Sequence, residues 1–303
     1  MDKKVKVARL SVASNTVLTT GKLIIGFSMG SVSVISEGFH SGMDLIAAII
    51  ALISVNKAAK PADTSYQYGY GKYENLASII EALLIVAAAG LITAEAYPRL
   101  FEPAPVHALG LGMLIMAVSA CVNLFVSRML LKAARETDSP ALAADGMHLL
   151  TDVYTSVGVL IGVIIIKFTG WYIVDPLIGI AVSIFILKAA WELIRDSIKS
   201  ILDMSLPEEE KKLIMKTLQK YEHKFVEFHE LRTRRAGAER HIDLHLVIAH
   251  HLSVGQVHEV CDEIESTIKQ LFPRCKVLIH AEPCDGSCER CNKDKNRSRC
   301  SYN

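Results

Sequence analysis

The sequence predicts a membrane α-helical bundle of six transmembrane helices, followed by a small cytoplasmic α+β domain. Hydrophobic residues make up 51% of the 303-residue chain, which is too apolar for an ordinary two-domain soluble protein. These residues gather in six long stretches before about residue 200, whereas the last hundred residues are richly charged. The composition therefore divides the chain into a membrane part and a soluble part.

Six apolar stretches are long enough to cross the roughly 30 Å hydrocarbon core, which takes about 20 helical residues. The first is diluted by polar residues such as Asn15 and Lys22, so we expect one of its faces to lie against protein or water. Asp175-Pro176 marks the start of the sixth, because proline is tolerated in a first helical turn. The stretches lie near residues 9–30, 33–56, 75–98, 108–131, 141–168 and 173–195.

Basic residues in the short loops predict the orientation of the chain. Lysine and arginine lie at the start, after the second span and after the fourth span, whereas the opposite side has few. By the positive-inside rule, both termini are cytoplasmic. The start lacks the compact apolar core of a cleaved signal peptide. The basic residues are Lys3, Lys4, Lys6, Arg9, Lys57, Lys60, Lys72, Arg128, Lys132 and Arg135.

One spacing, His-x-x-x-Asp, occurs twice inside apolar stretches, as His40 with Asp44 and as His148 with Asp152. On a helix, residues four apart lie on one face, about 6 Å apart along the axis. A charged Asp at the centre of a membrane helix costs roughly 2.5–3.5 kcal/mol on insertion scales. Two such helices offer two imidazoles and two carboxylates, a ligand set for a tetrahedral metal site. Alternatively, the four residues only pair across the helix interface.

Further acidic and basic residues lie within the spans. Glu37 and Asp145 each precede one of these histidines by three positions, so they lie on the same helical stripe. Glu81, Lys22 and Lys188 could line a water-filled pathway, but a charge near a helix end can also reach the interface. The sequence leaves open whether Glu37, Glu81 and Asp145 take part in metal binding or transport.

After Asp203 the pattern is that of an α-β-β-α-β domain. Pro207 opens a helix whose first turn is acidic, as the helix dipole favours. We expect strands near 224–235 and 239–249, a helix from 254 capped by Ser253 with Gln256 three residues on, and a strand over 275–282. This order suggests an open sheet with helices on one face.

Two groups of possible metal ligands stand out in this soluble part. His241, Asp243 and His245 alternate along the second strand, so they share one face, where they form a metal site or simply a solvated polar surface. The tail has cysteines in an irregular pattern that fits a zinc site or a plain flexible end. Disulfides are not expected in a reducing cytosol. The cysteines are Cys284, Cys288, Cys291 and Cys300.

From about residue 8 to 283 the chain resembles the cation diffusion facilitator family, the zinc-type metal:proton antiporters. Four motifs carry the resemblance. Residues 36–44 resemble the family's second helix, and residues 145–152 resemble its fifth. Residues 68–74 resemble its first cytoplasmic loop, and Leu202-Asp203 with residues 206–210 resemble the junction to its cytoplasmic domain. The resemblance implies a Y-shaped homodimer. Each protomer would have six helices and a ferredoxin-like cytoplasmic domain, and would export divalent cations against protons.

The resemblance also assigns roles to individual residues. It implies a transport site of His40, Asp44, His148 and Asp152, in which a histidine at the first position goes with zinc and an aspartate with cadmium or manganese. Two nitrogens and two oxygens suit Zn²⁺ better than Mg²⁺ or Ca²⁺. The cytoplasmic residues that match the family's regulatory zinc site are His229, His245, His258, His280 and Glu282, the last replacing a usual aspartate.

Two further expectations follow from the same matching. Lys72 and Asp203 would form a salt bridge between protomers at the membrane surface. A loop site that some bacterial members build from one aspartate and two histidines would here have Asp63, but Tyr66 and Tyr70 in place of the histidines. We therefore predict that the loop site is absent.

The sequence thus predicts a transmembrane domain over 1–204, a metal-sensing and dimerisation domain over 205–283 and a cysteine-rich tail over 284–303. The expected protein is a multi-pass transporter of a bacterial inner membrane, not an enzyme and without nucleic-acid partners. It would export Zn²⁺ for protons by alternating access, because protons and metal compete for the same ligands. The alternatives are Fe²⁺, Mn²⁺, Co²⁺ or Cd²⁺ as the main substrate, a membrane metalloenzyme, or a metal sensor with a membrane anchor.

Overall fold

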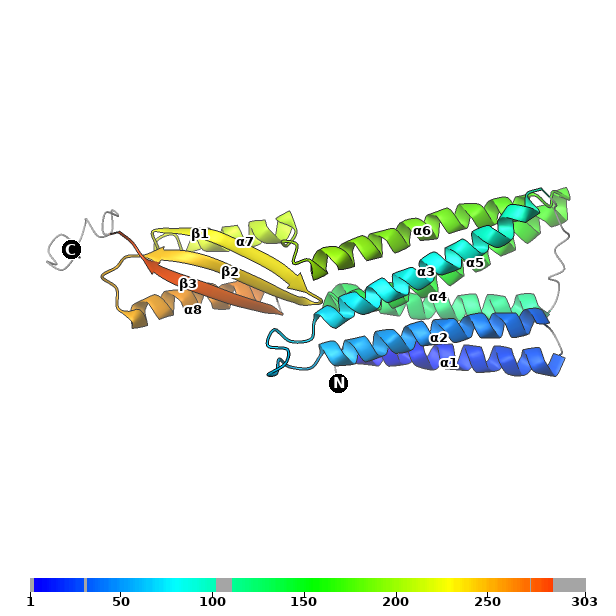
Figure 1. Cartoon of the computed structure of the whole chain (residues 1–303), viewed down its shortest axis with the longest axis horizontal. Coiled ribbons are helices and arrows are strands. Elements are labelled where there is room, and N and C mark those ends of the chain that lie inside the picture. The colour runs from blue at the N-terminus through cyan, green and yellow to red at the C-terminus, as the bar shows by residue number, and fades with distance from the viewer. Residues whose placement is uncertain (1–2, 30–31, 102–110, 273, 286–303) are drawn as a thin grey trace. The chain divides into compact units, whose positions relative to one another are not determined.

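The structure is a computed structural model that describes residues 3–29, 32–101, 111–272 and 274–285. The chain divides into two compact units, Met1–Ile201 and Leu202–Asn303. The first unit is helical and the second is built around a small sheet (Figure 1).

Six helices in the described part of the first unit confirm the predicted bundle. Helix α5 packs against α2, α3, α4 and α6, and α1 packs mainly against α2. Because α5 contacts α2, the two His-x-x-x-Asp motifs lie on neighbouring helices. The helices are α1 (Lys3–Met29), α2 (Val32–Ala58), α3 (Lys72–Arg99), α4 (Leu111–Thr137), α5 (Pro140–Thr169) and α6 (Val174–Ile201).

Within the described residues, four helical segments are long and apolar enough to cross a membrane: Gly38–Ala58, Lys72–Arg99, Ala117–Thr137 and Pro176–Ile201. Helix α1 is not among them, which agrees with its polar composition. It buries Asn15 and Lys22 against neighbouring helices and exposes Val17 and Phe27. The polar face of α1 therefore lies against protein, as expected.

Close approach between α1 and α2 depends on a glycine beside the first metal motif. A Cβ atom at Gly38 would lie 2.6 Å from Cδ2 of Leu23 on α1, closer than packed atoms allow. Small residues at such crossings let membrane helices approach closely. Gly38 thus sets the position of the α2 turn that carries His40.

A buried polar network ties together the starts of three helices. Lys4 Nζ of α1 donates a hydrogen bond to Glu74 Oε1 of α3 at 2.7 Å, and Ser139, which immediately precedes α5, donates to the other oxygen of Glu74. The side chains of Lys4 and Glu74 are only 1% and 3% exposed. Opposite charges this deeply buried must be paired, since either one alone would be costly.

The second unit has the predicted α-β-β-α-β order. Its three-stranded sheet has the order β1-β2-β3, with β2 antiparallel to β1 and parallel to β3. Helix α8 provides the crossover that a parallel pair requires. The elements are α7 (Glu208–Lys220), β1 (Glu227–Ala236), β2 (Glu239–Ile248), α8 (Val254–Leu271) and β3 (Cys275–Pro283).

Two local sequence features that predicted helix starts in this unit are also confirmed. Ser253 and Gln256 form the predicted capping box at the start of α8. The acidic first turn of α7 has a further use, because Glu210 accepts two hydrogen bonds from the buried Arg240 of β2, at 2.8 and 3.0 Å. Such a bidentate pair fixes the helix against the sheet.

Alternation along β2 separates a core face from a polar face. Ile242, Leu244 and Leu246 pack in one apolar cluster with Ile214 of α7 and Ile264 of α8. The residues between them therefore point to the opposite face of the sheet. That polar face carries His241 and His245 of β2.

We predict that Glu74→Ala lowers the free energy of unfolding of the membrane unit by about 3–5 kcal/mol, because Lys4 would stay buried without its counter-charge. The control is Glu136→Ala, which removes the exposed partner of Lys3 and should cost at most about 1 kcal/mol. Thermal unfolding of the full chain in detergent measures both. Equal losses in the two variants would contradict the network's role.

Candidate metal centres

The two His-x-x-x-Asp motifs meet in crossed pairs between α2 and α5. His148 Nε2 lies 3.2 Å from Asp44 Oδ1, and His40 Nε2 lies 3.8 Å from Asp152 Oδ1. One ligand atom each of His40, Asp44 and Asp152 lies within 4.8 Å of the other two. The structure therefore brings three of the four predicted residues within reach of one ion, and His148 adjoins them through its contact with Asp44.

Burial within this four-residue cluster is uneven. The side chains of Asp44 and His148 are only 4% and 8% exposed, whereas His40 is 52% exposed. Among the described residues, Asp152 Oδ2 and His148 Nδ1 are buried without a hydrogen-bond partner. A buried carboxylate oxygen is costly to leave unpaired, and a bound cation would satisfy it. The donor set of two imidazoles and two carboxylates fits a tetrahedral divalent metal.

Polar neighbours adjoin this cluster on α1 and α2. Lys22 Nζ of α1 donates to Ser41 Oγ at 2.8 Å, and Ser41 is the residue after His40. This buried bond anchors the α2 motif against α1. The side chain of Glu37, the acid that precedes His40, lies outside the described residues.

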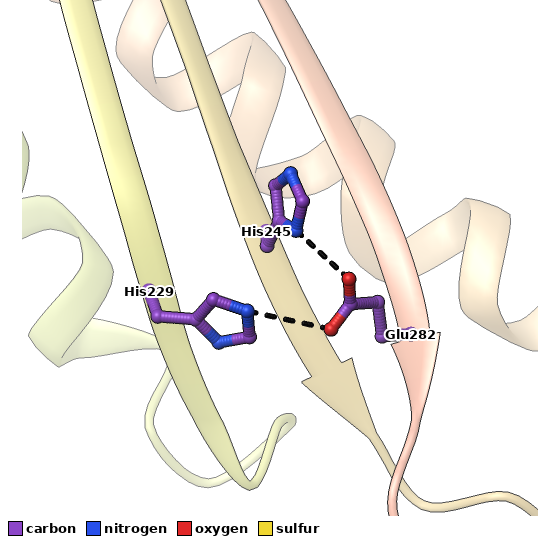
Figure 2. A group of neighbouring side chains, drawn as sticks. All are labelled: His229, His245 and Glu282. Atoms are coloured by element: carbon purple, nitrogen blue, oxygen red, sulfur yellow. Dashed lines mark hydrogen bonds and ion pairs between the residues drawn. The ribbon is translucent and has the colours of Figure 1, made fainter.

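A second cluster lies across the sheet of the second unit (Figure 2). His229 of β1, His245 of β2 and His280 of β3 are aligned in one row, because His245 is the register partner of both others. Glu282 of β3 reaches all three histidines. Its carboxylate lies 2.8 Å from His245 Nδ1, 3.4 Å from His229 Nε2 and 3.7 Å from His280 Nε2.

Glu230 is a neighbour of this row that the sequence reasoning missed. Its Oε2 lies 3.8 Å from His245 Nε2. The ladder shifts register between His229 and Arg232, and Glu230 has a positive φ of 49°. This bulge turns Glu230 toward the histidine row, a change of direction that strand alternation alone does not predict.

Three of the predicted soluble-unit residues lie apart from the row or only beside it. His258 is exposed on α8, with Nε2 at 3.4 Å from Asp262 Oδ2. His241 and Asp243 share a face with His245, but four residues along a strand span roughly 13 Å. Burial, then the nearby Arg234, lowers the pKa of His241. Only His245 of that alternating trio joins the metal-like cluster.

Comparison with known proteins identifies the family. A model described as the cation efflux transmembrane domain matches residues 8–202, and one described as the cation efflux protein cytoplasmic domain matches residues 206–284. The chain belongs to the cation efflux family. The resemblance to cation diffusion facilitators is thereby confirmed, and the protein is a cation efflux transporter of the membrane.

Two of the relatives found match this transporter over most of its length, and a solved structure matches a smaller part. An uncharacterized transporter of Synechocystis is 36% identical, covering 84% of this chain and 82% of its own. The cation-efflux pump FieF of Shewanella oneidensis is 31% identical, covering 91% and 93%. A solved structure of CzrB in its Zn form is 39% identical, covering 27% of this chain and 92% of that chain, with a TM-score of 0.26.

In this cation efflux protein, tyrosines contact Asp63 and each other in the loop between α2 and α3. Tyr70 Oη donates to Asp63 Oδ2 at 2.5 Å, which lowers the pKa of Asp63 and raises the pKa of Tyr70 to about 12. The rings of Tyr66 and Tyr70 lie against each other at a tilt of 38°, with centroids 4.5 Å apart. Asp63 is thus held by phenol and backbone donors where the family's loop site would need imidazoles. That the loop site is absent stays a prediction.

The remaining predicted residues have these positions. Lys72 Nζ donates to the carbonyl oxygen of Ile201 at 3.1 Å, and Asp203 accepts from Arg234 Nη1 at 3.3 Å. Their salt bridge between protomers stays a prediction. Cys284 Sγ lies 3.9 Å from His250 Nδ1, while Cys288, Cys291 and Cys300 lie outside the described residues.

We predict that Glu282→Gln weakens zinc binding to the histidine row by at least about tenfold, because the amide loses the charge that faces all three imidazoles. Glu259→Gln, an exposed change on α8, is the matched control. Zinc titration of the full chain, with the bound metal counted per protomer, measures the effect. Wild-type stoichiometry and affinity in Glu282→Gln would show that this row holds no metal.

Proposed function

We propose that this transporter exports a divalent metal ion, with Zn²⁺ as the main substrate, from the cytoplasm in exchange for protons. The observation that supports it most directly is the cluster of His40, Asp44, His148 and Asp152 between α2 and α5. These four side chains come from two different helices. A relative movement of α2 and α5 would change the cluster's geometry, which is what alternating access requires.

The donor types favour zinc among divalent metals. Imidazole with carboxylate suits Zn²⁺, whereas Mg²⁺ and Ca²⁺ prefer more oxygen ligands. Affinity order alone does not choose between zinc and Fe²⁺, Mn²⁺, Co²⁺ or Cd²⁺, so these are the competing substrates. FieF is named as a cation-efflux pump, which agrees with export of a cation by this chain.

The crossed His–Asp pairs suggest how protons replace the metal. A protonated imidazole of His148 would donate from Nε2 to Asp44, and His40 would do the same to Asp152. Two such protons carry the same charge as one divalent ion. Exchanging them for the metal leaves the site's net charge unchanged, so neither state leaves uncompensated charge in the bilayer.

The cytoplasmic unit would regulate this exchange. His229, His245, His280 and Glu282 form a partly exposed row that can sample cytosolic zinc. Zinc there would draw the soluble units of a homodimer together and bias the membrane helices toward one state. His258 would join that site only through a different arrangement of α8 or through the second protomer. We place the homodimer in a bacterial inner membrane with both termini cytoplasmic.

Asp152→Asn should abolish zinc flux, because it removes one carboxylate charge while keeping the side chain's shape. The control is Asp196→Asn, an exposed change on α6, which should leave flux unchanged. Flux is measured in proteoliposomes loaded with a zinc indicator, with and without a pH gradient. Zinc uptake that survives alanine at all four cluster positions would overturn the proposed function.

Replacing His40 by Asp tests which metal the cluster prefers. A carboxylate can bind through two oxygens, so it accommodates larger ions with higher coordination numbers than an imidazole does. We expect His40→Asp to raise Cd²⁺ and Mn²⁺ flux relative to Zn²⁺ flux several-fold. Competition between metals in the same vesicles gives the ratio, and His258→Asp is the control. An unchanged ratio would show that His40 does not select the metal.

A further inference from the structure

Two acidic side chains in the membrane unit have no role in the four-residue metal cluster. Glu81 of α3 and Asp145 of α5 are both 0% exposed. Both carboxylate oxygens of each residue are buried without a hydrogen-bond partner among the described residues. Lys4 and Glu74, by contrast, form a buried ion pair, and the buried carboxylate of Asp44 faces His148.

Glu81 and Asp145 lie on two helices that pack against each other, α3 and α5. Both side chains are fully buried there, and Asp145 acts electrostatically on Glu81. Asp145 lies near the hydroxyl group of Ser11 on α1 and is also reached by the charges of His148 and Asp44. Ser11 is uncharged, and His148 already faces the carboxylate of Asp44. Two buried carboxylates that interact without a counter-ion of their own cannot both be ionised in an apolar interior.

The position of the pair connects the metal cluster to one end of the bundle. Asp145 precedes His148 by three residues, so their side chains share a helical face. The network of Lys4, Glu74 and Ser139 gathers the starts of α1, α3 and α5 at one end. Glu81 and Asp145 lie in the first halves of α3 and α5. They are thus placed between that end and the metal ligands.

We propose that Glu81 and Asp145 form a proton-binding pair, separate from the metal ligands, that relays protons between the metal cluster and the cytoplasmic end of the bundle. This rests on the proposed exchange of metal for protons. In each relay step, one proton leaves the histidine–aspartate pairs and binds a carboxylate of Glu81 or Asp145, as that pair releases one proton toward the cytosol. One O–H bond forms and one breaks, so the pair ends the step with its original charge.

Two substitutions of Glu81 and one control separate this role from packing. Glu81→Gln keeps the shape of the side chain but cannot carry a proton, whereas Glu81→Asp shortens it and keeps the carboxyl group. A packing role would make Gln the milder change, and a proton relay makes Asp the milder change. Glu95→Gln on the same helix is the control, because Glu95 is exposed and pairs with Arg99.

The measurement uses the full-length transporter in proteoliposomes, with zinc and pH indicators inside. In Glu81→Gln we expect zinc flux driven by a pH gradient to fall by roughly a hundredfold, the size of contribution a positioned proton carrier makes. Zinc-for-zinc exchange without a gradient should stay near the wild-type rate, since it needs no net proton transfer. Glu81→Asp should retain more of the pH-driven flux than Glu81→Gln.

Infrared difference spectra without metal give an independent readout. The band of a protonated carboxyl group should be present in the wild type and reduced in Glu81→Gln and in Asp145→Asn.

Several outcomes would overturn the proposal. These are wild-type gradient-driven zinc flux in Glu81→Gln, an unchanged carboxyl band, loss of one bound zinc per protomer, or equal loss of gradient-driven flux and zinc exchange. Absence of proton movement in the wild type would instead defeat the proposed exchange itself, which distinguishes the two failures.

Discussion

The cost of placing charge inside an apolar helical bundle governs this structure. Each buried charged group needs a partner, a proton or a metal ion. Lys4 and Glu74 illustrate the first solution, a buried ion pair that ties α1 to α3. His148 with Asp44 illustrates a pair that can be opened, because an imidazole can give up its proton and become a neutral metal ligand. A fixed lysine–glutamate pair holds helices together, whereas a histidine–aspartate pair is able to exchange its proton for a metal.

The cytoplasmic centre follows from a different constraint, the geometry of a sheet. Ladder pairing aligns His229, His245 and His280 in a single row, although 51 positions separate the first from the last in the sequence numbering. Strand alternation keeps that row off the face where Leu244 packs into the core. Because the row is partly exposed, binding a metal there would cost its side chains little desolvation, which suits the proposed response to metal in the surrounding solution.

Much of this was predictable because it depends on local or periodic signals. The six helices follow from the length of the apolar stretches, and the capping box at Ser253 from residues three apart. The pairing of His40 with Asp152 rather than with Asp44 was not predictable, since it depends on how α2 and α5 cross. Glu230 was missed for a related reason, because a bulge changes the direction of a side chain without changing the sequence period. His258 matched a family motif, but its helix places it apart from the strands.

The two centres differ in a way that matches their proposed tasks. At the membrane cluster the histidines lie against carboxylates of the opposite helix, so binding a metal would require that protons leave. At the sheet row one carboxylate, Glu282, lies near three histidines, so a cation would be attracted there without disrupting a buried pair. Under the proposed function, binding in the membrane would be coupled to proton movement, which would make release possible. Binding on the sheet would depend mainly on the metal concentration, which is the property that a regulatory site needs.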